Sequence, residues 1–397
     1  MKILVVMTHY PYPPRTGSAI LAYHTIKALS HKHNIHLISA DDEKERGDLA
    51  EYVEKIEFIG RKKQPIILKL LKYAFYSLRG FPTWLISSMS TEMERRTAEL
   101  VAGEHYDAIL LYEITAIQYC PESCYEKMVV NVEDPPSIKL SRLRKMGIWP
   151  FRKRVGLAIL EKMTARYERD VFPQLASVLV LSEADSMDMR NLLGCNNIGY
   201  IPYGIDAMPT ERIVPHEQRT EDMIVFSGNM HHPPNVDGAL FLLRHILLLV
   251  LKECPNAKLW IVGASPDRTI FEEAQGFGDH VVITGQVAEI SEYLRRATVS
   301  VCPVKLKVGV QTKVLEALSC GTPVVTTSAG NSGICGSTGL DLWAEDEPEK
   351  FAQRVVSLLR GENWTQLSKN GRELAANRFS WARSAALLEN HLEEIAN

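Results

Sequence analysis

Residues 301–327 read VCPVKLKVGVQTKVLEALSCGTPVVTT, and this stretch decides the fold of the region around it. Two short apolar runs, one at each end, have the length of buried strands and bracket a helical segment from about residue 312 to residue 320. Glycine and proline mark the turns between these segments. The order predicts a strand–helix–strand unit of a parallel α/β sheet. Ligands of such sheets bind beyond the carboxyl ends of the strands, so we expect a ligand near the loop that carries Gly309.

Lys313 and Glu316 lie three positions apart on the predicted helix, which places both side chains on one face. The N-terminus of that helix attracts phosphate through its free N–H groups and its dipole. An ammonium group suits a diphosphate, and a carboxylate suits the paired hydroxyls of a ribose. The same spacing is typical of an ion pair on an exposed helix, and the local sequence leaves both interpretations open.

Composition narrows the class of protein. The chain has 397 residues, which favours two domains of about 200 residues each. Hydrophobic residues make up 46% and charged residues 23%, as in a soluble globular protein, and the net charge of -3 provides no basic field for nucleic acid. The seven cysteines are scattered and odd in number, which indicates a reduced, cytoplasmic chain without a zinc site.

The first residues, MKILVVMTHY, predict a β-strand and not a signal peptide, because the apolar run is too short. No window approaches the roughly 18 consecutive apolar residues of a membrane span. The first 40 residues predict a strand, a long loop, a helix over about 19–31 and a second strand. The loop brings Gly17 to the helix N-terminus, where backbone N–H groups can approach an anion, although a glycine is also an ordinary turn residue. The loop lacks the GxGxxG pattern, so a dinucleotide cofactor is disfavoured.

Glu133 and Asp134 follow a predicted strand over 128–132, and the carboxyl end of a parallel strand is a usual place for functional residues. Their carboxylates would hydrogen-bond a sugar hydroxyl or act as a base. A turn or helix N-cap before the adjacent prolines is the alternative role for either residue.

Two basic segments mix cations with large apolar residues. Residues 61–86 resemble a helix that lies on an anionic membrane surface, with a core helix of cationic outer face as the alternative. Residues 139–169 contain ten cations against two glutamates, which is typical of a solvated face or of a surface that receives an acidic acceptor or membrane phosphates. A peripheral contact with the inner face of a membrane is therefore one prediction for both segments.

The second half of the chain repeats the alternation of strands and helices after a polar segment over 207–222. We predict an N-terminal domain over 1–206 and a C-terminal domain over 207–379. The last helix, 380–397, is expected to pack back on the N-terminal domain. The fold class is α/β, with two Rossmann-like domains that face a deep cleft.

Several short segments, all in the same order, resemble the signature of a known family. They are FSGNM (226–230), PNVD (234–237), IVG (261–263), TGQV (284–287) and GVQTKVLEAL (309–318), together with YER (167–169), SEAD (182–185) and IPYGID (201–206). On these residues the chain resembles the retaining, metal-independent glycosyltransferases of the GT-B architecture, and more narrowly glycosyltransferase family 4, the sugar transferase group 1 type. The resemblance covers nearly the whole chain and is strongest from residue 225 to residue 325.

The resemblance implies that the N-terminal domain binds the acceptor and the C-terminal domain the donor, and it implies roles for individual residues. Glu316 would hold the ribose hydroxyls, Lys313 or Lys305 would face the diphosphate, and Gly17 would approach the phosphates from the other domain. The backbone around Val310 would contact the donor sugar. The remaining donor-binding residues that the matching segments imply are Gly228, Asn229, Gly263, Gly309, Gln311 and Thr312.

The chain departs from the family pattern at two positions. Val308 stands where the family commonly has a glutamate that contacts the donor sugar, and Asn229 stands where an arginine is usual. Both departures increase the expected importance of Lys305, Lys307 and Lys313.

The predicted activity is that of a hexosyltransferase. It would move a sugar from a nucleotide-diphosphate sugar, UDP- or GDP-linked, to a hydroxyl of a glycan, a lipid-linked or a small-molecule acceptor, without a metal or other cofactor. Lys313 and Glu316, with Glu133 and Asp134, are the predicted catalytic residues. Alternatives on the same fold are a nucleotide-sugar epimerase, a sugar phosphorylase and a catalytically silent nucleotide-binding subunit.

Overall fold

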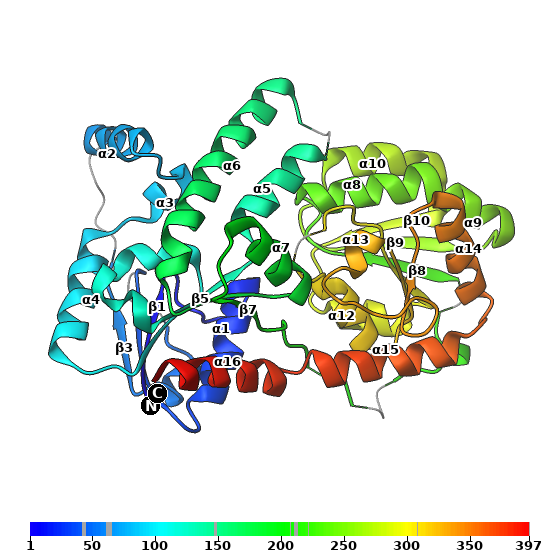
Figure 1. The fold of residues 1–397 in the computed structure, drawn as a ribbon. Coiled ribbons are helices and arrows are strands. Elements are labelled where there is room, and N and C mark those ends of the chain that lie inside the picture. Colours follow the sequence, from blue (N-terminus) through cyan, green and yellow to red (C-terminus); the bar gives the residue numbers. More distant parts are fainter. Residues whose placement is uncertain are drawn as a thin grey trace. The chain divides into compact units, whose positions relative to one another are not determined.

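The chain folds into two compact α/β units in the computed structural model (Figure 1). The model describes residues 1–41, 45–60, 66–146, 149–206, 208–209, 213–220, 222–307 and 309–396. The first unit comprises Met1–Gly204 and Trp381–Asn397, and the second comprises Ile205–Ser380. The boundaries inferred from the sequence lie within two residues of these positions.

The first unit is built on a seven-stranded parallel sheet with the order β3-β2-β1-β4-β5-β6-β7. Its strands are β1 (Lys2–Met7), β2 (Asn34–Ser39), β3 (Lys55–Phe58), β4 (Ala108–Leu111), β5 (Met128–Glu133), β6 (Ser177–Val180) and β7 (Ile198–Tyr200). The central strands are nearly continuous runs of buried apolar residues, as expected when helices cover both faces of a parallel sheet. The strand order reverses between β1 and β4, which places a binding crevice at that point of the carboxyl edge.

Helices surround this sheet. They are α1 (Gly17–Leu29), α2 (Ile66–Leu78), α3 (Thr83–Ser88), α4 (Thr91–Gly103), α5 (Pro136–Lys145), α6 (Phe151–Val171), α7 (Glu183–Leu193) and α16 (Trp381–Ala396), with 3₁₀ segments η1 (Asp48–Glu51), η2 (Ile114–Tyr119), η3 (Glu122–Lys127) and η4 (Phe172–Gln174). Helix α1 begins two residues before the predicted start because Thr16 caps it, accepting a hydrogen bond from the Ala19 N–H. The last helix, α16, packs against α1 (Figure 1).

The second unit contains a six-stranded parallel sheet with the order β10-β9-β8-β11-β12-β13. Its strands are β8 (Met223–Ser227), β9 (Lys258–Val262), β10 (Val281–Gly285), β11 (Val299–Cys302), β12 (Val324–Thr326) and β13 (Trp343–Ala344). Its helical segments are η6 (His216–Gln218), α8 (Pro233–Phe241), η7 (Leu242–Ile246), α9 (Leu247–Glu253), α10 (Arg268–Ala274), η8 (Gln275–His280), α11 (Ile290–Arg296), α12 (Thr312–Ser319), α13 (Ser328–Asn331), α14 (Pro348–Leu359) and α15 (Trp364–Arg378). The strand order reverses between β8 and β11, and the stretch that opened the sequence analysis is β11–α12–β12.

A long apolar helical run, Pro233–Glu253, follows β8, and a π-helical turn in it joins α8 to α9. By length and composition, it is the one helix of the described chain that would cross a membrane, and half of its most apolar window is buried. Leu242, Leu247 and Val250 belong to the core of the second unit. The run is therefore a core helix of this unit.

Arg219 anchors the turn that follows α12. Its buried guanidinium donates hydrogen bonds to the carbonyl oxygens of Cys320 and Gly321, at 3.2 and 3.1 Å, and to the hydroxyl of Thr322 at 2.7 Å. Burial lowers the pKa of Arg219 to about 10. A cation at the C-terminal end of a helix stabilises the helix dipole, so Arg219 holds α12 in place from the end opposite to the predicted site.

Candidate active site

The site in the second unit begins with two glycines at the ends of neighbouring strands. Gly228 follows β8 with φ 148°, and Gly263 follows β9 with φ 145°, conformations that favour glycine. A Cβ atom on Gly263 would clash with the carbonyl oxygen of Gly228. The two predicted glycines are thus needed for the backbones of β8 and β9 to approach each other at the carboxyl edge.

Lys313 points to this edge from α12. Its Nζ donates a hydrogen bond to Oδ1 of Asn235 at 2.5 Å and lies 4.8 Å from the ring centre of Phe226. A Cβ atom on Gly228 would lie 3.1 Å from the same Nζ, so no side chain stands between the ammonium and the end of β8. Burial lowers the pKa of Lys313, because the charged form loses hydration.

Asn235 is a site residue that the sequence analysis quoted in a motif but did not assign a role. Its Nδ2 donates to the carbonyl oxygen of Asn229 at 2.9 Å while its Oδ1 accepts from Lys313. Asn235 therefore ties the loop after β8 to the lysine of α12. The proline pair before it, which starts α8, was the available sequence signal for its position.

The N-terminus of α12 is open. The N-cap residue, Gln311, makes no side-chain capping bond, and the backbone N–H groups of Thr312 and Lys313 have no partner among the residues that the structure describes. Gly309, which has a φ of 60°, and Val310 immediately precede the N-cap residue. These N–H groups and the helix dipole form a place for an anion next to the Lys313 ammonium.

Glu316 lies one turn further along α12. Its half-buried carboxylate forms no hydrogen bond or ion pair with the described residues, so the interpretation of Lys313 and Glu316 as a direct surface ion pair is wrong. Burial raises the pKa of Glu316, and the positive charge of Lys313 opposes that rise. The carboxylate is available to accept hydrogen bonds from a ligand.

Three other predicted positions contribute less to this geometry. The exposed Lys305 rests 4.3 Å above the ring centre of Phe241, and Asn229 accepts a hydrogen bond from the His231 N–H through its side chain. Val308, where the chain departs from the pattern of the family that it resembles, lies outside the described residues.

The first unit carries a second set of predicted residues at its own carboxyl edge. Glu133, the last residue of β5, adopts φ 57°, which is strained for a residue other than glycine. Its Oε1 is buried without a hydrogen-bond partner among the described residues, and its Oε2 lies 3.9 Å from where a Cβ atom on Gly17 would be. Burial, followed by the negative charges of Asp134 and Glu113, raises the pKa of Glu133 to about 7.

The residues near Glu133 are Asp134, Gly17 and Glu113. Asp134 forms an ion pair with Lys139 at 2.8 Å, and Pro135, not Asp134, is the N-cap of α5. Gly17 is the first residue of α1, as its loop position suggested. Glu113 was not predicted; it follows β4 and accepts a hydrogen bond from Thr115 at 3.0 Å. Its place after a buried apolar run was the available signal.

Within the described parts of the chain, no group of three or more His, Cys, Asp and Glu side chains lies close enough together to hold a metal ion.

Known proteins share this architecture. Residues 221–361 match the family described as Glycosyl transferases group 1. A curated relative, the "Uncharacterized 44.6 kDa protein in cps region" of Klebsiella pneumoniae, is 22% identical over 401 residues, covering 96% of this chain and 95% of the relative.

Two solved structures cover essentially the whole chain. HepE (Alr3699) of Anabaena, in complex with UDP and glucose, matches with a TM-score of 0.67 and 14% identity, over 99% of this chain and 100% of that one. A point mutant of TarM of S. aureus, in complex with Fondaparinux, alpha-GlcNAc-glycerol and UDP, matches with a TM-score of 0.68 and 11% identity, over 100% of each chain. The predicted α/β, GT-B fold is confirmed. Together with the matching domain, these findings support an enzyme of the glycosyltransferase class.

Proposed function

We propose that the protein transfers a sugar from a nucleotide-diphosphate sugar to an acceptor hydroxyl, with retention of the anomeric configuration and without a metal. The observation that carries this proposal is the arrangement on α12: the Lys313 ammonium, held by Asn235, beside an open helix N-terminus, with the free Glu316 carboxylate one turn away. A cation with free N–H groups suits a diphosphate, and a carboxylate suits ribose hydroxyls. The UDP in the HepE and TarM structures supports a uridine nucleotide as the first donor to test.

The chemical demand is to stabilise the charge that grows on the leaving diphosphate. Lys313 and the N–H groups of Thr312 and Lys313 are fixed before the reaction, so they would stabilise that charge without reorganisation. With front-face attack, the leaving phosphate itself can take the proton of the acceptor hydroxyl. Glu133 then orients a hydroxyl and is not required as a base. Asp134, paired with Lys139, helps to raise the pKa of Glu133.

The direct experiment is a screen of UDP- and GDP-sugars, which measures thermal shift and nucleotide release with and without glycan acceptors. A ligand that binds only the folded state raises the melting temperature by mass action. We expect turnover of at least one donor that is insensitive to EDTA. A new sugar isomer formed without acceptor would instead identify an epimerase, and transfer that requires inorganic phosphate would identify a phosphorylase. Binding without turnover would identify a silent subunit, and strict dependence on Mg²⁺ or Mn²⁺ would contradict metal independence.

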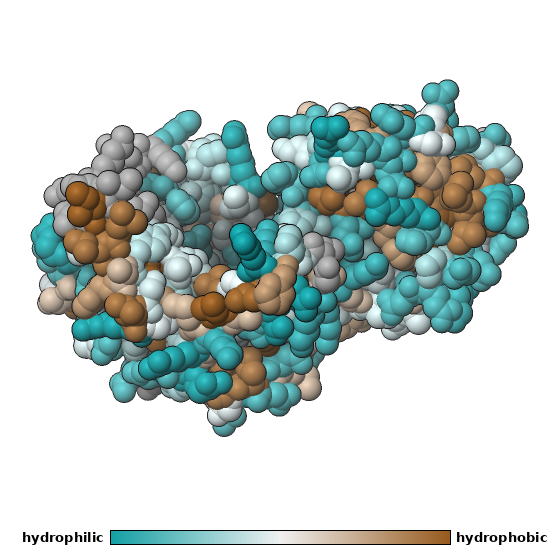
Figure 2. Space-filling model, turned by 90° about the horizontal axis from the view of Figure 1, so that it is seen from above, coloured by the Kyte–Doolittle hydropathy of each residue, from teal (hydrophilic) through white to brown (hydrophobic). Residues whose placement is uncertain are grey.

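We also propose a cytoplasmic enzyme that contacts an anionic membrane surface through α2 and α6. Five large apolar side chains of α2 are exposed, with Leu78 at 90% and Ile67 at 68%, so the alternative of a core helix fails for this face. On α6, Phe151 is 79% exposed and precedes three consecutive cations, Arg152, Lys153 and Arg154. Figure 2 shows hydrophobic residues exposed among hydrophilic ones over this unit. Residues 61–65, 147 and 148 of the two predicted segments lie outside the described chain.

Vesicle co-sedimentation tests this contact. The wild type should sediment with vesicles that contain phosphatidylserine, and a Leu70→Glu/Leu78→Glu variant should remain in the supernatant, because charged side chains oppose insertion of an apolar face into lipid. The matched control is Leu192→Glu/Leu248→Glu, which changes exposed leucines on other helices. Equal sedimentation of both variants would contradict the proposal.

A further inference from the structure

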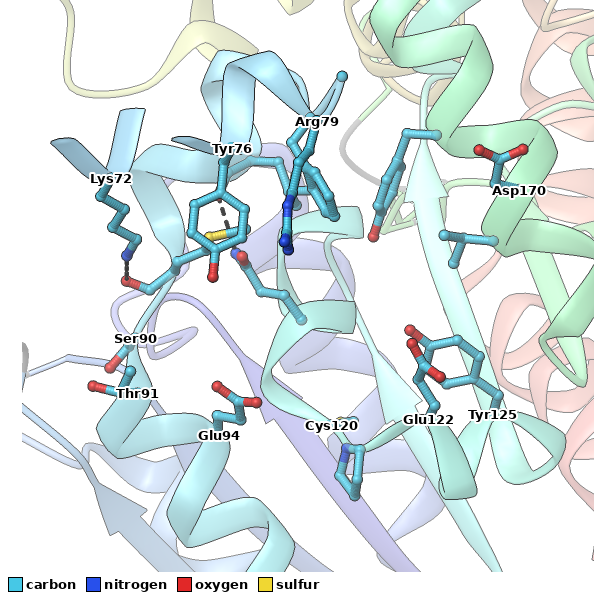
Figure 3. Close-up of a pocket in the computed structure, with 18 of the residues that line it drawn as sticks. Lys72, Tyr76, Arg79, Ser90, Thr91, Glu94, Cys120, Glu122, Tyr125 and Asp170 are labelled. Carbon is cyan, nitrogen blue, oxygen red and sulfur yellow. Dashed lines mark hydrogen bonds between the residues drawn. The ribbon is translucent and has the colours of Figure 1, made fainter. Parts of the chain in front are cut away.

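A pocket lies in the first unit, away from the carboxyl edge that carries Glu133. Its volume is about 400 Å³, within the usual range for small-ligand sites. Helix α2 and the segment that follows it, helix α4, η3 and the C-terminal half of α6 form its walls (Figure 3). The η3 wall stands at the amino end of β5, and Glu133 is the last residue of that strand. At about 3.3 Å per residue, β5 separates the two by roughly 17 Å.

The unpaired groups in this pocket favour hydroxyl-bearing ligands. The side-chain hydroxyls of Tyr76 and Tyr125 and the carboxylates of Glu94 and Glu122 form no hydrogen bond or ion pair with the residues that the structure describes. Figure 3 shows the Tyr76 hydroxyl and the Arg79 guanidinium pointing into the pocket from one side and the two carboxylates from the other. Carboxylates and hydroxyls that accept hydrogen bonds, together with the planar guanidinium that donates them, match a ligand that is rich in hydroxyl groups.

The charges of the pocket balance, because three cations, Lys72, Arg79 and Arg166, stand against three carboxylates, Glu94, Glu122 and Asp170. Two of these cations are already engaged: Lys72 donates to the Met89 carbonyl oxygen at 3.1 Å, and Arg166 pairs with Asp170 at 3.6 Å. Arg79, stacked 4.1 Å from the ring centre of Phe75, is then the one cation of the described lining without a polar partner, against two free carboxylates. The lining as a whole therefore carries no net charge, which favours a neutral ligand over a phosphate or sulfate group.

Aromatic rings supply the apolar part of the site. Tyr76 and Phe81 have ring centres 5.5 Å apart, and Phe81 lies 6.1 Å from Tyr167, so three rings follow one another along one wall. Burial raises the pKa of Tyr125 to about 12, which keeps its hydroxyl protonated and able to donate. Flat apolar faces beside carboxylates and hydroxyls match the two kinds of surface of a sugar ring.

From this geometry we propose that the pocket binds neutral sugar units of an extended glycan acceptor, remote from the hydroxyl that reacts. The inference rests on the proposed transferase function, since it names the class of acceptor. An acceptor that occupies both the pocket and the reaction centre must span several sugar units. Binding in the pocket would then raise the affinity for long acceptors and leave short acceptors unaffected.

The first test is binding to the full chain without any donor. Saturation-transfer NMR and titration with malto-, cello-, manno- and chito-oligosaccharides of one to six units should detect at least one neutral ligand. Tyr76→Ala and Glu122→Gln should each weaken its binding about tenfold or more. Glu126→Gln is the matched control, because Glu126 is exposed on the same η3 segment and does not line the pocket.

Three outcomes would overturn the inference: no neutral oligosaccharide binds, sulfated heparin oligosaccharides bind in place of neutral ones, or Glu122→Gln and Glu126→Gln bind equally well. Melting curves verify that each variant is folded. Donor hydrolysis is measured separately on the same samples. Loss of hydrolysis with intact glycan binding would refute the transferase and not the pocket, whereas intact hydrolysis without glycan binding would refute the pocket alone.

With an accepted glycan series, KM provides the second readout. Glu122→Gln should raise KM for the longest acceptor about tenfold, with kcat and the KM of a monosaccharide acceptor unchanged. A uniform loss across all lengths would indicate a general structural defect and overturn the proposal.

Discussion

The carboxyl edge of the second sheet presents glycine backbone, the Lys313 ammonium and the open N-terminus of α12, whereas the corresponding edge of the first sheet presents the carboxylates of Glu113 and Glu133. Both edges lie at the point where strand order reverses, so topology alone does not distinguish them. Their charges do. An edge with free N–H groups and a cation suits phosphate, and an edge with carboxylates suits hydroxyl groups and repels phosphate.

This contrast favours the second unit as the place proposed for the diphosphate and argues against a phosphate contact at Gly17. The Glu133 carboxylate lies beside the N-terminus of α1, where Gly17 was expected to approach phosphate. A phosphate there would meet Glu133, which is partly ionised at neutral pH because its pKa is about 7. The expected effects of mutation on the two edges therefore differ in size and in pH dependence.

The largest effect is expected for Lys313→Ala. Removal of one preorganised group that stabilises developing charge typically lowers kcat by about 10²- to 10³-fold, and we expect donor turnover to fall by at least that factor. Lys369→Ala, an exposed lysine of α15, is the matched control. Steady-state nucleotide release measures both. Wild-type turnover in Lys313→Ala would remove the basis for placing the diphosphate at α12.

Glu316→Ala should have the next largest effect, mainly on donor affinity. Hydrogen bonds to a charged group contribute about 1.5–3 kcal/mol, so loss of the ribose contact should weaken donor binding by about 10- to 100-fold and bring turnover at low donor concentration close to zero. Titration calorimetry with the nucleotide diphosphate measures the change. Glu373→Ala on α15 is the control, and equal affinities of the two variants would exclude a ribose contact at Glu316.

A smaller, pH-dependent effect is expected at the acidic edge. If the ionised form of Glu133 orients a hydroxyl, the rate of transfer rises with pH through about 7 and then levels off. Glu133→Gln should lower kcat about tenfold at pH 8 and flatten this rise, because glutamine does not titrate. The pH–rate profiles of both proteins provide the measurement. An unchanged profile in the variant would show that another group controls the titration.

The two edges also differ in how far the sequence predicted them. Strands β1, β2, β5, β11 and β12 and helix α12 were predicted because apolar runs, helical spacing and glycine or proline turns are local signals. The hydrogen bond between Lys313 and Asn235 was not predicted, because the two residues are 78 positions apart and only folding brings them together. The raised pKa of Glu133 depends mainly on burial, which the sequence NVEDPP does not encode locally, and its positive φ has no local signal either, because glutamate rarely adopts it. The exposure of the apolar face of α2 was undecided because periodicity does not reveal what covers a helix.

The smallest expected effect separates Glu133 from Glu168, a buried glutamate of the same unit. The pKa of each is raised to about 7, mainly by burial, but Glu168 accepts hydrogen bonds from the N–H and the hydroxyl of Ser137, whereas Oε1 of Glu133 has no partner among the described residues. A carboxyl group whose pKa is higher in the folded state than its unfolded value of about 4.3 destabilises the fold as pH rises between these two values.

Glu133→Gln should therefore be more stable than the wild type at pH 8, with a melting temperature roughly 2–4 °C higher for each 1 kcal/mol gained, and should lose this advantage at pH 4. Glu168→Gln should instead melt lower than Glu133→Gln at pH 8, because one amide group cannot accept both hydrogen bonds of Ser137. Calorimetric scans at the two pH values measure both variants, and identical shifts would mean that the free oxygen of Glu133 does not distinguish it from a structural glutamate.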